Sequence, residues 1–133
     1  MLTKIELETK KENEIIDVAG RIDEVVWGSN VKDGVAIVYS PHTACGIMAN
    51  ENTDPALKED LLREFGMLFP RNDARYLHRG ENADAHIKTA LTGASVSVII
   101  EDRKLLLGKW QSIYVCEFDG PKKRHLYVKI LAG

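Results

Sequence analysis

The sequence has few cysteines, no excess of positive charge and no long apolar run. Its only cysteines are Cys45 and Cys116, too few for a disulfide framework and typical of free thiols in a reducing compartment. Eighteen basic against twenty acidic residues argue against a protein that mainly holds a nucleic-acid backbone. Residues 1–11 lack the apolar core of a secretory signal or a membrane span. We therefore expect a cytoplasmic protein with no nucleic-acid and no membrane partner.

The length and apolar content indicate one globular unit. A chain of 133 residues that is 44% apolar can bury a sizeable core without disulfides or a structural metal. We find no internal repeat and no low-complexity linker. A single domain over residues 1–133 is the prediction.

Hydrophobic periodicity predicts a mixture of strands and helices. Alternation predicts a strand over residues 2–9, and helical spacing from Ile15 to Val26 predicts a first helix. Asp54-Pro55 is a helix start, and Pro70 follows the end of that helix. A shorter helix is expected over residues 82–91, and further strands over 35–39, 46–49, 96–100, 105–107, 110–118 and 125–131. Helices in the middle and successive strands at the end favour an α+β domain.

Residues 76–88 contain two of the four histidines in a setting that packing does not explain. The segment up to Asp84 is polar and contains Gly80, so its side chains are free to converge on a ligand. His78 is expected on the loop that leads into the helix. His86 is expected on the helix, one turn after Asn82 and on the same face.

His42, His78 and His86 are candidates for a shared metal or acid–base site, because neutral imidazole binds divalent metals and titrates near neutrality. The alternative is three separate surface histidines, since no pair at i, i+4 spacing exists. Three histidines with an open position suit a catalytic zinc, whereas added oxygens from Glu51 suit magnesium or manganese. His125 belongs to no such pattern and is expected to lie outside the site.

The last strands supply a second group of candidates. Gln111 and Glu117 share one face of the strand over residues 110–118 and could line a pocket, or else lie at solvated strand ends. Lys122 and Arg124 could neutralise phosphate oxygens. Cys45 lies three residues after His42, so a His-x-x-Cys ligand pair is a further alternative.

Several short motifs occur together in a fixed order from about Val35 to the end of the chain. They are Ser40-Pro41-His42-Thr43, Asn50-Glu51, Tyr76-x-His78, Asn82-Ala83-Asp84-Ala85-His86-Ile87-Lys88, Leu107-Gly108-Lys109-Trp110-Gln111 and Glu117-Phe118-Asp119-Gly120-Pro121. In combination they resemble the YjbQ-like family, called the secondary thiamine-phosphate synthases. Two residues depart from the family pattern: Ala44 replaces a threonine, and Lys122 replaces an arginine, which removes a two-point contact to an anion.

The resemblance implies a single YjbQ-like domain of two packed, mostly antiparallel β-sheets with a few helices, which forms a homotrimer. It also implies thiamine-phosphate synthase activity, which joins a hydroxymethylpyrimidine diphosphate to a thiazole phosphate and releases pyrophosphate. Expected catalytic residues are His42, Glu51, His78, His86 and Glu117, with a divalent metal, zinc or magnesium/manganese, on His42, His78 and His86. Expected substrate-binding residues are Thr43, Asn50, Asn82, Lys88, Gln111, Lys122 and Arg124.

The leading hypothesis from the sequence is therefore a small transferase that acts on a phosphorylated metabolite. Cations would stabilise the departing diphosphate, and a histidine would protonate it. A metal-dependent hydrolase that uses the same residues is the first alternative. A trimeric metal- or ligand-binding module without turnover is the second.

Overall fold

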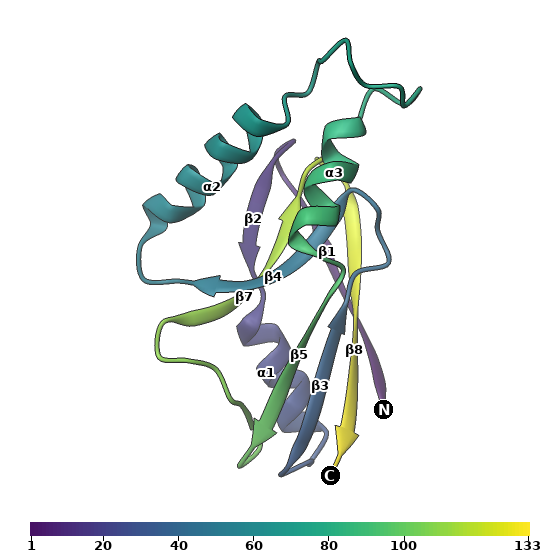
Figure 1. Ribbon diagram of the computed structural model, residues 1–133. Coiled ribbons are helices and arrows are strands. Elements are labelled where there is room, and N and C mark those ends of the chain that lie inside the picture. Colours follow the sequence, from purple (N-terminus) through teal and green to yellow (C-terminus); the bar gives the residue numbers. More distant parts are fainter.

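The computed structural model describes residues 1–133 as an α+β domain with two antiparallel sheets (Figure 1). The elements follow in the order β1 (Leu2–Glu8), β2 (Glu14–Asp17), α1 (Ala19–Gly28), β3 (Gly34–Tyr39), β4 (Cys45–Glu51), α2 (Pro55–Leu68), α3 (Ala83–Thr92), β5 (Ser95–Glu101), β6 (Lys104–Leu105), β7 (Gln111–Glu117) and β8 (Lys123–Ala132). The predicted fold class is confirmed.

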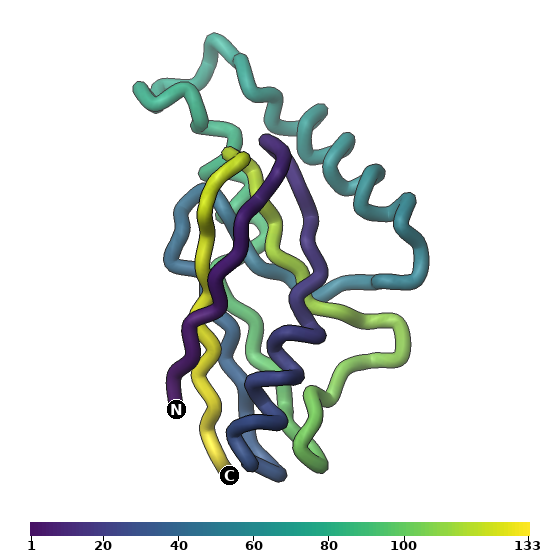
Figure 2. The backbone as a smooth tube through the Cα atoms, turned by 180° about the vertical axis from the view of Figure 1, so that it is seen from behind, coloured from purple at the N-terminus to yellow at the C-terminus, as the bar shows by residue number.

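The larger sheet has five strands in the order β1-β8-β3-β5-β6. Within it β8 pairs with β1 on one side and with β3 on the other, in register Ile5↔Leu126 and Ala36↔Ile130. The first and last strands are therefore neighbours, and the two termini lie close together in both backbone views (Figures 1 and 2).

The smaller sheet has three strands in the order β2-β7-β4. The register of β4 on β7 runs from Cys45↔Glu117 at one end to Glu51↔Gln111 at the other. The two pairs are six positions apart along β4, which is about 20 Å at 3.3 Å per residue. This spacing decides which of the predicted residues can meet within one chain.

The main core fills the space between the two sheets and α1. Alternate residues of both sheets point into it, as the pleat of a strand requires. Its fully buried members include Ile22 and Val26 of α1, Ala36, Val38, Ile47, Ile113, Val115, Leu126 and Val128. The opposite face of the smaller sheet carries Tyr114, Cys116 and Phe118, which form a second cluster with Ala85 of α3 and partly buried residues of α2.

The predicted helix start at Asp54-Pro55 is confirmed in its details. The Asp54 side chain accepts a hydrogen bond from the Ala56 N–H at 2.9 Å, and Pro55 is the first helical residue. None of the residues of α2 is fully buried, and the helix projects from the body of the domain (Figure 1). The chain then forms a long loop before α3.

Two element predictions were wrong. Ile15 was expected in a helix but belongs to β2, and the helix begins only at Ala19. Ile15 and Ile16 instead pair with Cys116 and Val115 of β7, so pairing with a strand distant in sequence overrides the local helical spacing. The strand expected over residues 105–107 contains only Lys104 and Leu105.

No helix is long and apolar enough to cross a bilayer.

Candidate functional site

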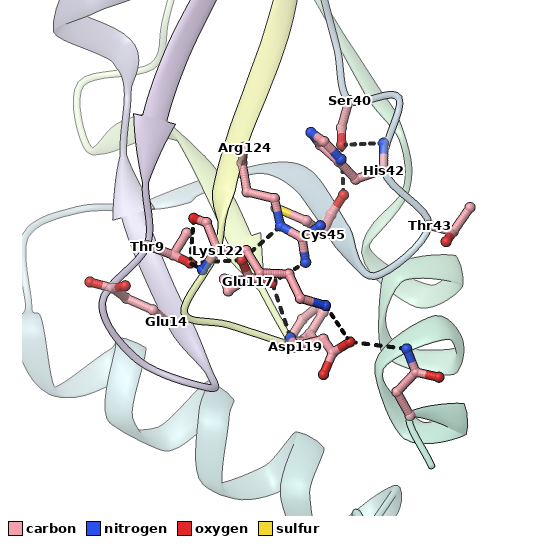
Figure 3. Close-up of polar contacts among 12 residues, drawn as sticks. Thr9, Glu14, Ser40, His42, Thr43, Cys45, Glu117, Asp119, Lys122 and Arg124 are labelled. Atoms are coloured by element: carbon pink, nitrogen blue, oxygen red, sulfur yellow. Dashed lines mark hydrogen bonds and ion pairs between the residues drawn. The ribbon is translucent and has the colours of Figure 1, made fainter. Parts of the chain in front are cut away.

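A buried ion pair joins the end of β7 to the start of β8. Arg124 donates from Nε to Oε1 of Glu117 at 2.8 Å and from Nη2 to Oε2 at 2.7 Å (Figure 3). The Thr9 hydroxyl donates to the same carboxylate at 2.8 Å, and the Asp119 N–H donates at 3.0 Å. Glu117 is fully buried, and the Arg124 side chain is 8% exposed. The geometry is the two-point contact that fixes a guanidinium in one orientation.

The electrostatics of this pair favour the charged forms. Burial raises the pKa of Glu117, but the hydrogen bonds from Arg124, the Asp119 N–H and Thr9 outweigh it, and the net pKa is lowered. The pKa of Arg124 is raised, mainly by its bond to Glu117. Nη1 of Arg124 makes no hydrogen bond within the chain and is not sealed from solvent. The N–H groups on Nη1 of this rigidly held cation are thus available to an anion.

Asp119 is the centre of a second polar group. Its Oδ1 accepts from Arg71 Nη2 at 2.6 Å, and its Oδ2 accepts from Lys122 Nζ at 2.9 Å and from Asn82 Nδ2 at 3.0 Å. Burial raises the pKa of Asp119, yet these three donors together hold it well below its usual range. Asp119 is therefore ionised at neutral pH and acts only as an acceptor.

Two of the predicted histidines meet at the start of α3. The ring centroids of His78 and His86 are 5.1 Å apart in an edge-to-face arrangement. His78 Nε2 lies 3.0 Å from Asn82 Oδ1, and His86 Nδ1 lies 3.0 Å from the Thr43 carbonyl oxygen. Both rings are therefore held by hydrogen bonds.

A surface hollow of about 600 Å³ opens beside these rings. Its lining combines His78 and His86 with Thr43, Arg75, Tyr76, Leu77 and Ile87. Leu77 is 95% exposed. The mixture of imidazole, apolar and cationic groups suits a flat heterocycle that carries a phosphate.

His42 does not join the other two histidines. Its Nε2 lies 3.1 Å from the backbone N–H of His125 and accepts a hydrogen bond from it, and the two rings are in contact at 4.8 Å between centroids. Burial and the neighbouring charge of Arg124 lower the pKa of His42, so its imidazole is neutral at neutral pH. His125, expected outside the site, is in fact the partner of His42.

The three histidines therefore do not converge on one point in a single chain. No group of three or more His, Cys, Asp or Glu side chains is arranged to hold a metal ion. His78 and His86 supply two imidazoles, whereas His42 uses Nε2 for the His125 N–H. The residues of one chain thus fit the expected three-histidine metal site only in part.

Other predicted residues fall into three sets. Thr43, Asn82, Glu117, Lys122 and Arg124 contribute to the polar groups around α3 and the β7–β8 hairpin. Lys88 is 3% exposed and bonded to Asp84 at 2.8 Å, so its ammonium is held in the interior. Asn50, Glu51 and Gln111 lie at the far end of β4 and β7. Within one chain they are not part of this site, and their roles stay predictions.

The alternative His42 and Cys45 pair is not formed. The Cys45 side chain is buried in the main core, and burial raises the pKa of its thiol to about 12. Cys116 belongs to the second cluster, on the opposite face of the smaller sheet. The two cysteines are free thiols.

Sequence reasoning missed three residues that organise the site. Thr9 is 108 residues from Glu117, and nothing local indicates their contact. Arg71 follows a helix end and reads as an ordinary loop cation, yet it contacts Asp119, Asp84 and Glu12. Asp119 occurs in the motif Glu117-Phe118-Asp119-Gly120-Pro121. Its position between a strand and a Gly-Pro turn was the one sequence signal of a role in the site.

The fold and these residues define a class: two-sheet α+β domains that carry a polar site where α3 meets a β-hairpin. The family model described as UPF0047 protein YjbQ-like matches residues 3–133. The chain belongs to the YjbQ-like UPF0047 family.

Relatives and solved structures agree over nearly the whole chain. The UPF0047 protein of Methanocaldococcus jannaschii is 46% identical over 131 residues, with 98% of this chain and 94% of the relative covered. The UPF0047 protein YugU of Bacillus subtilis is 40% identical, with coverage of 98% and 99%. A crystal structure of a family member from Clostridium acetobutylicum superposes with a TM-score of 0.94 at 43% identity, with coverage of 97% and 99%. The crystal structure of a YbjQ-like protein of unknown function from Sulfolobus solfataricus superposes with a TM-score of 0.95 at 29% identity, with coverage of 100% and 97%.

Proposed function

We propose that this protein is a cytoplasmic transferase of the thiamine-phosphate synthase type, with a phosphorylated heterocycle as its substrate. In this reaction the thiazole nitrogen attacks the methylene carbon of the hydroxymethylpyrimidine diphosphate. The bond from that carbon to the diphosphate oxygen breaks, and pyrophosphate leaves with the electron pair. The protein has to hold the two rings in line and stabilise the departing charge.

The observation that carries this proposal is the hollow beside the paired rings of His78 and His86. Leu77, Ile87 and Tyr76 offer apolar surface to a heterocycle, and Thr43 offers a hydroxyl. If one of these histidines is protonated while the substrate is bound, it would donate that proton to the leaving diphosphate. Both histidines are at the edge of the hollow, where such a group is needed.

Two cations of the β7–β8 hairpin, Arg124 and Lys122, suit phosphate groups, but they lie outside the lining of this hollow. Arg124 keeps Nη1 free while Glu117 fixes the rest of its guanidinium. Lys122 is bonded to Asp119 and half exposed, so its ammonium can move toward an anion at the cost of one ion pair. Lys88 has no such freedom, because Asp84 holds it in the interior.

A divalent metal, zinc or magnesium/manganese, is a separate part of the proposal. His78 and His86 would supply two ligands, and His42 would have to give up its bond from the His125 N–H to supply a third. A bound metal would supply positive charge for the leaving diphosphate. Metal content of the purified protein, compared with that of His78→Ala, His86→Ala and His42→Ala, tests this assignment.

The activity itself is tested with purified protein, the pyrimidine diphosphate and the thiazole phosphate, with thiamine phosphate measured by chromatography. His86→Ala should reduce turnover by about 100-fold or more, as expected for the loss of a general acid. Glu64→Gln is the control, because Glu64 lies on the exposed surface of α2 and is not among the predicted site residues. Full turnover in His86→Ala would refute the proposed site. Release of the free pyrimidine alcohol without coupling would instead identify a hydrolase, and saturable binding without turnover would identify a binding module.

The expected homotrimer is also part of the proposal. One face of the larger sheet packs on the core, whereas its other face exposes Leu2, Tyr39, Ile99 and Leu131. A second copy of the chain would remove this apolar surface from water. Light scattering at micromolar concentration should give a trimer mass, and a monomer mass would contradict this part of the proposal.

A further inference from the structure

The hydrogen bonds between Asp119, Asn82 and His78 form a chain with only one consistent direction. An ionised carboxylate accepts and cannot donate, so the Asn82 amide must present its NH₂ group to Asp119. The amide oxygen then faces His78 Nε2, which lies 3.0 Å away. Because this oxygen only accepts, Nε2 of His78 must carry a hydrogen, and in the neutral ring Nδ1 then keeps the free electron pair.

His86 has the opposite arrangement. Its Nδ1 lies 3.0 Å from the Thr43 carbonyl oxygen, which also only accepts. Nδ1 of His86 therefore carries a hydrogen, and in the neutral ring Nε2 keeps the free electron pair. The two adjacent rings thus present complementary nitrogens, each fixed by a different partner.

We propose that Asp119 is a positioning residue that fixes, through Asn82, the Nε2–H tautomer of His78. It holds the Nδ1 electron pair of His78 available next to His86 without contacting the substrate itself. The catalytic role of Asp119 rests on the proposed function. The tautomer of His78, in contrast, is a property of the protein without substrate and can be measured on its own. Lys122 bonds the same carboxylate oxygen as Asn82, whereas Arg71 bonds the other one.

Gly80 gives independent support for this arrangement. A Cβ built on Gly80 would lie 2.8 Å from His78 Nε2 and 3.0 Å from Asn82 Oδ1. Any larger residue would therefore push directly against the two atoms that make the hydrogen bond. Those atoms are the ends of side chains, so they can move aside without disturbing the backbone. Gly80→Ala should thus separate His78 from Asn82 while the fold is kept.

The test is nitrogen-15 NMR of the histidine rings, read through the ring C–H protons at about pH 9, where imidazole is ordinarily neutral. In the wild type, His78 should be predominantly the Nε2–H form and His86 predominantly the Nδ1–H form. In Asp119→Asn the Asn82 amide is free to turn over, so His78 should become a mixture with a measurable Nδ1–H fraction. Gly80→Ala should give a mixture as well, although Asp119 is intact. His86 should not change in either variant, and it reports that α3 is still folded.

Arg71→Gln is the matched control, because it removes a partner from Oδ1 of Asp119 and leaves the Asn82 bond to Oδ2. It should leave the tautomer population of His78 as it is in the wild type. In the turnover assay, Asp119→Asn should lower kcat and leave KM little changed. The loss in kcat should be smaller than the roughly 100- to 10,000-fold that complete loss of general acid–base catalysis causes. An unchanged His78 tautomer in Asp119→Asn, or an equal change in Arg71→Gln, would overturn the assignment. Absence of any synthase turnover would refute the proposed function but leave the NMR result standing.

Discussion

Replacing Arg124 by methionine should be strongly destabilising, because it leaves the Glu117 carboxylate charged in the interior. Glu117 has no solvent exposure, and the change removes two of its four hydrogen bonds, those at 2.8 and 2.7 Å. Breaking a buried ion pair by removing one partner typically costs ~3–5 kcal/mol. Thr9 and the Asp119 N–H remain as donors, so a loss of ~3 kcal/mol is expected.

The assay is urea unfolding followed by circular dichroism, at one fixed protein concentration because association also stabilises a fold. Glu117→Gln removes the charge that Arg124→Met leaves unpaired. The double variant should therefore be more stable than the sum of the two single changes implies, by ~1–3 kcal/mol. A loss below ~1 kcal/mol for Arg124→Met, or strict additivity in the double variant, would refute the argument that this pair is a coupled buried unit.

Three further predictions follow from buried groups. Because the folded pKa values of Glu117 and Asp119 are lowered, their stabilisation is complete above the ordinary carboxyl pKa of about 4 and is lost as the pH falls through the lower folded values. Unfolding free energy should thus drop below about pH 4, and a flat profile there would contradict it. Burial raises the thiol pKa values of Cys45 and Cys116 to about 12, so a thiol reagent should label them only after unfolding. Immediate labelling of the native protein would be inconsistent with that burial. Gly46→Ala places a Cβ 2.8 Å from the backbone oxygen of Gly93, so it should lower the melting temperature, whereas Gly66→Ala, with nothing within 4 Å, should not.

Local sequence signals were sufficient where an element is stabilised by its own residues. Two adjacent residues, the Asp54 cap and Pro55, determine the start of α2. The apolar alternation of residues 2–9 predicted β1 correctly. The segment around Ile15 failed for the opposite reason. Its apolar spacing fits a helix, but its place in the structure is decided by pairing with β7, about 100 residues later.

The candidate site divides in the same way. Asn82 and His86 share a helix face, and Glu117 and Arg124 flank one turn, so short spacing was enough to bring each pair together. The partnership of His42 with His125, and the contact of Thr9 with Glu117, join segments separated by 83 and 108 residues. These contacts are created by the pairing of β8 with β3 and β1 and by the position of β7. His42 was grouped with His78 and His86 because all three occur in the quoted motifs, but occurrence in motifs does not place residues side by side in the fold.

The most direct test of the central proposal is a crystal structure of the protein soaked with pyrophosphate and the pyrimidine alcohol. The account predicts the heterocycle in the hollow bordered by Thr43, His78 and His86, with a phosphate oxygen within hydrogen-bond distance of one of the two rings. Ligand density at the opposite end of β4, beside Glu51 and Gln111, with the hollow empty, would contradict it.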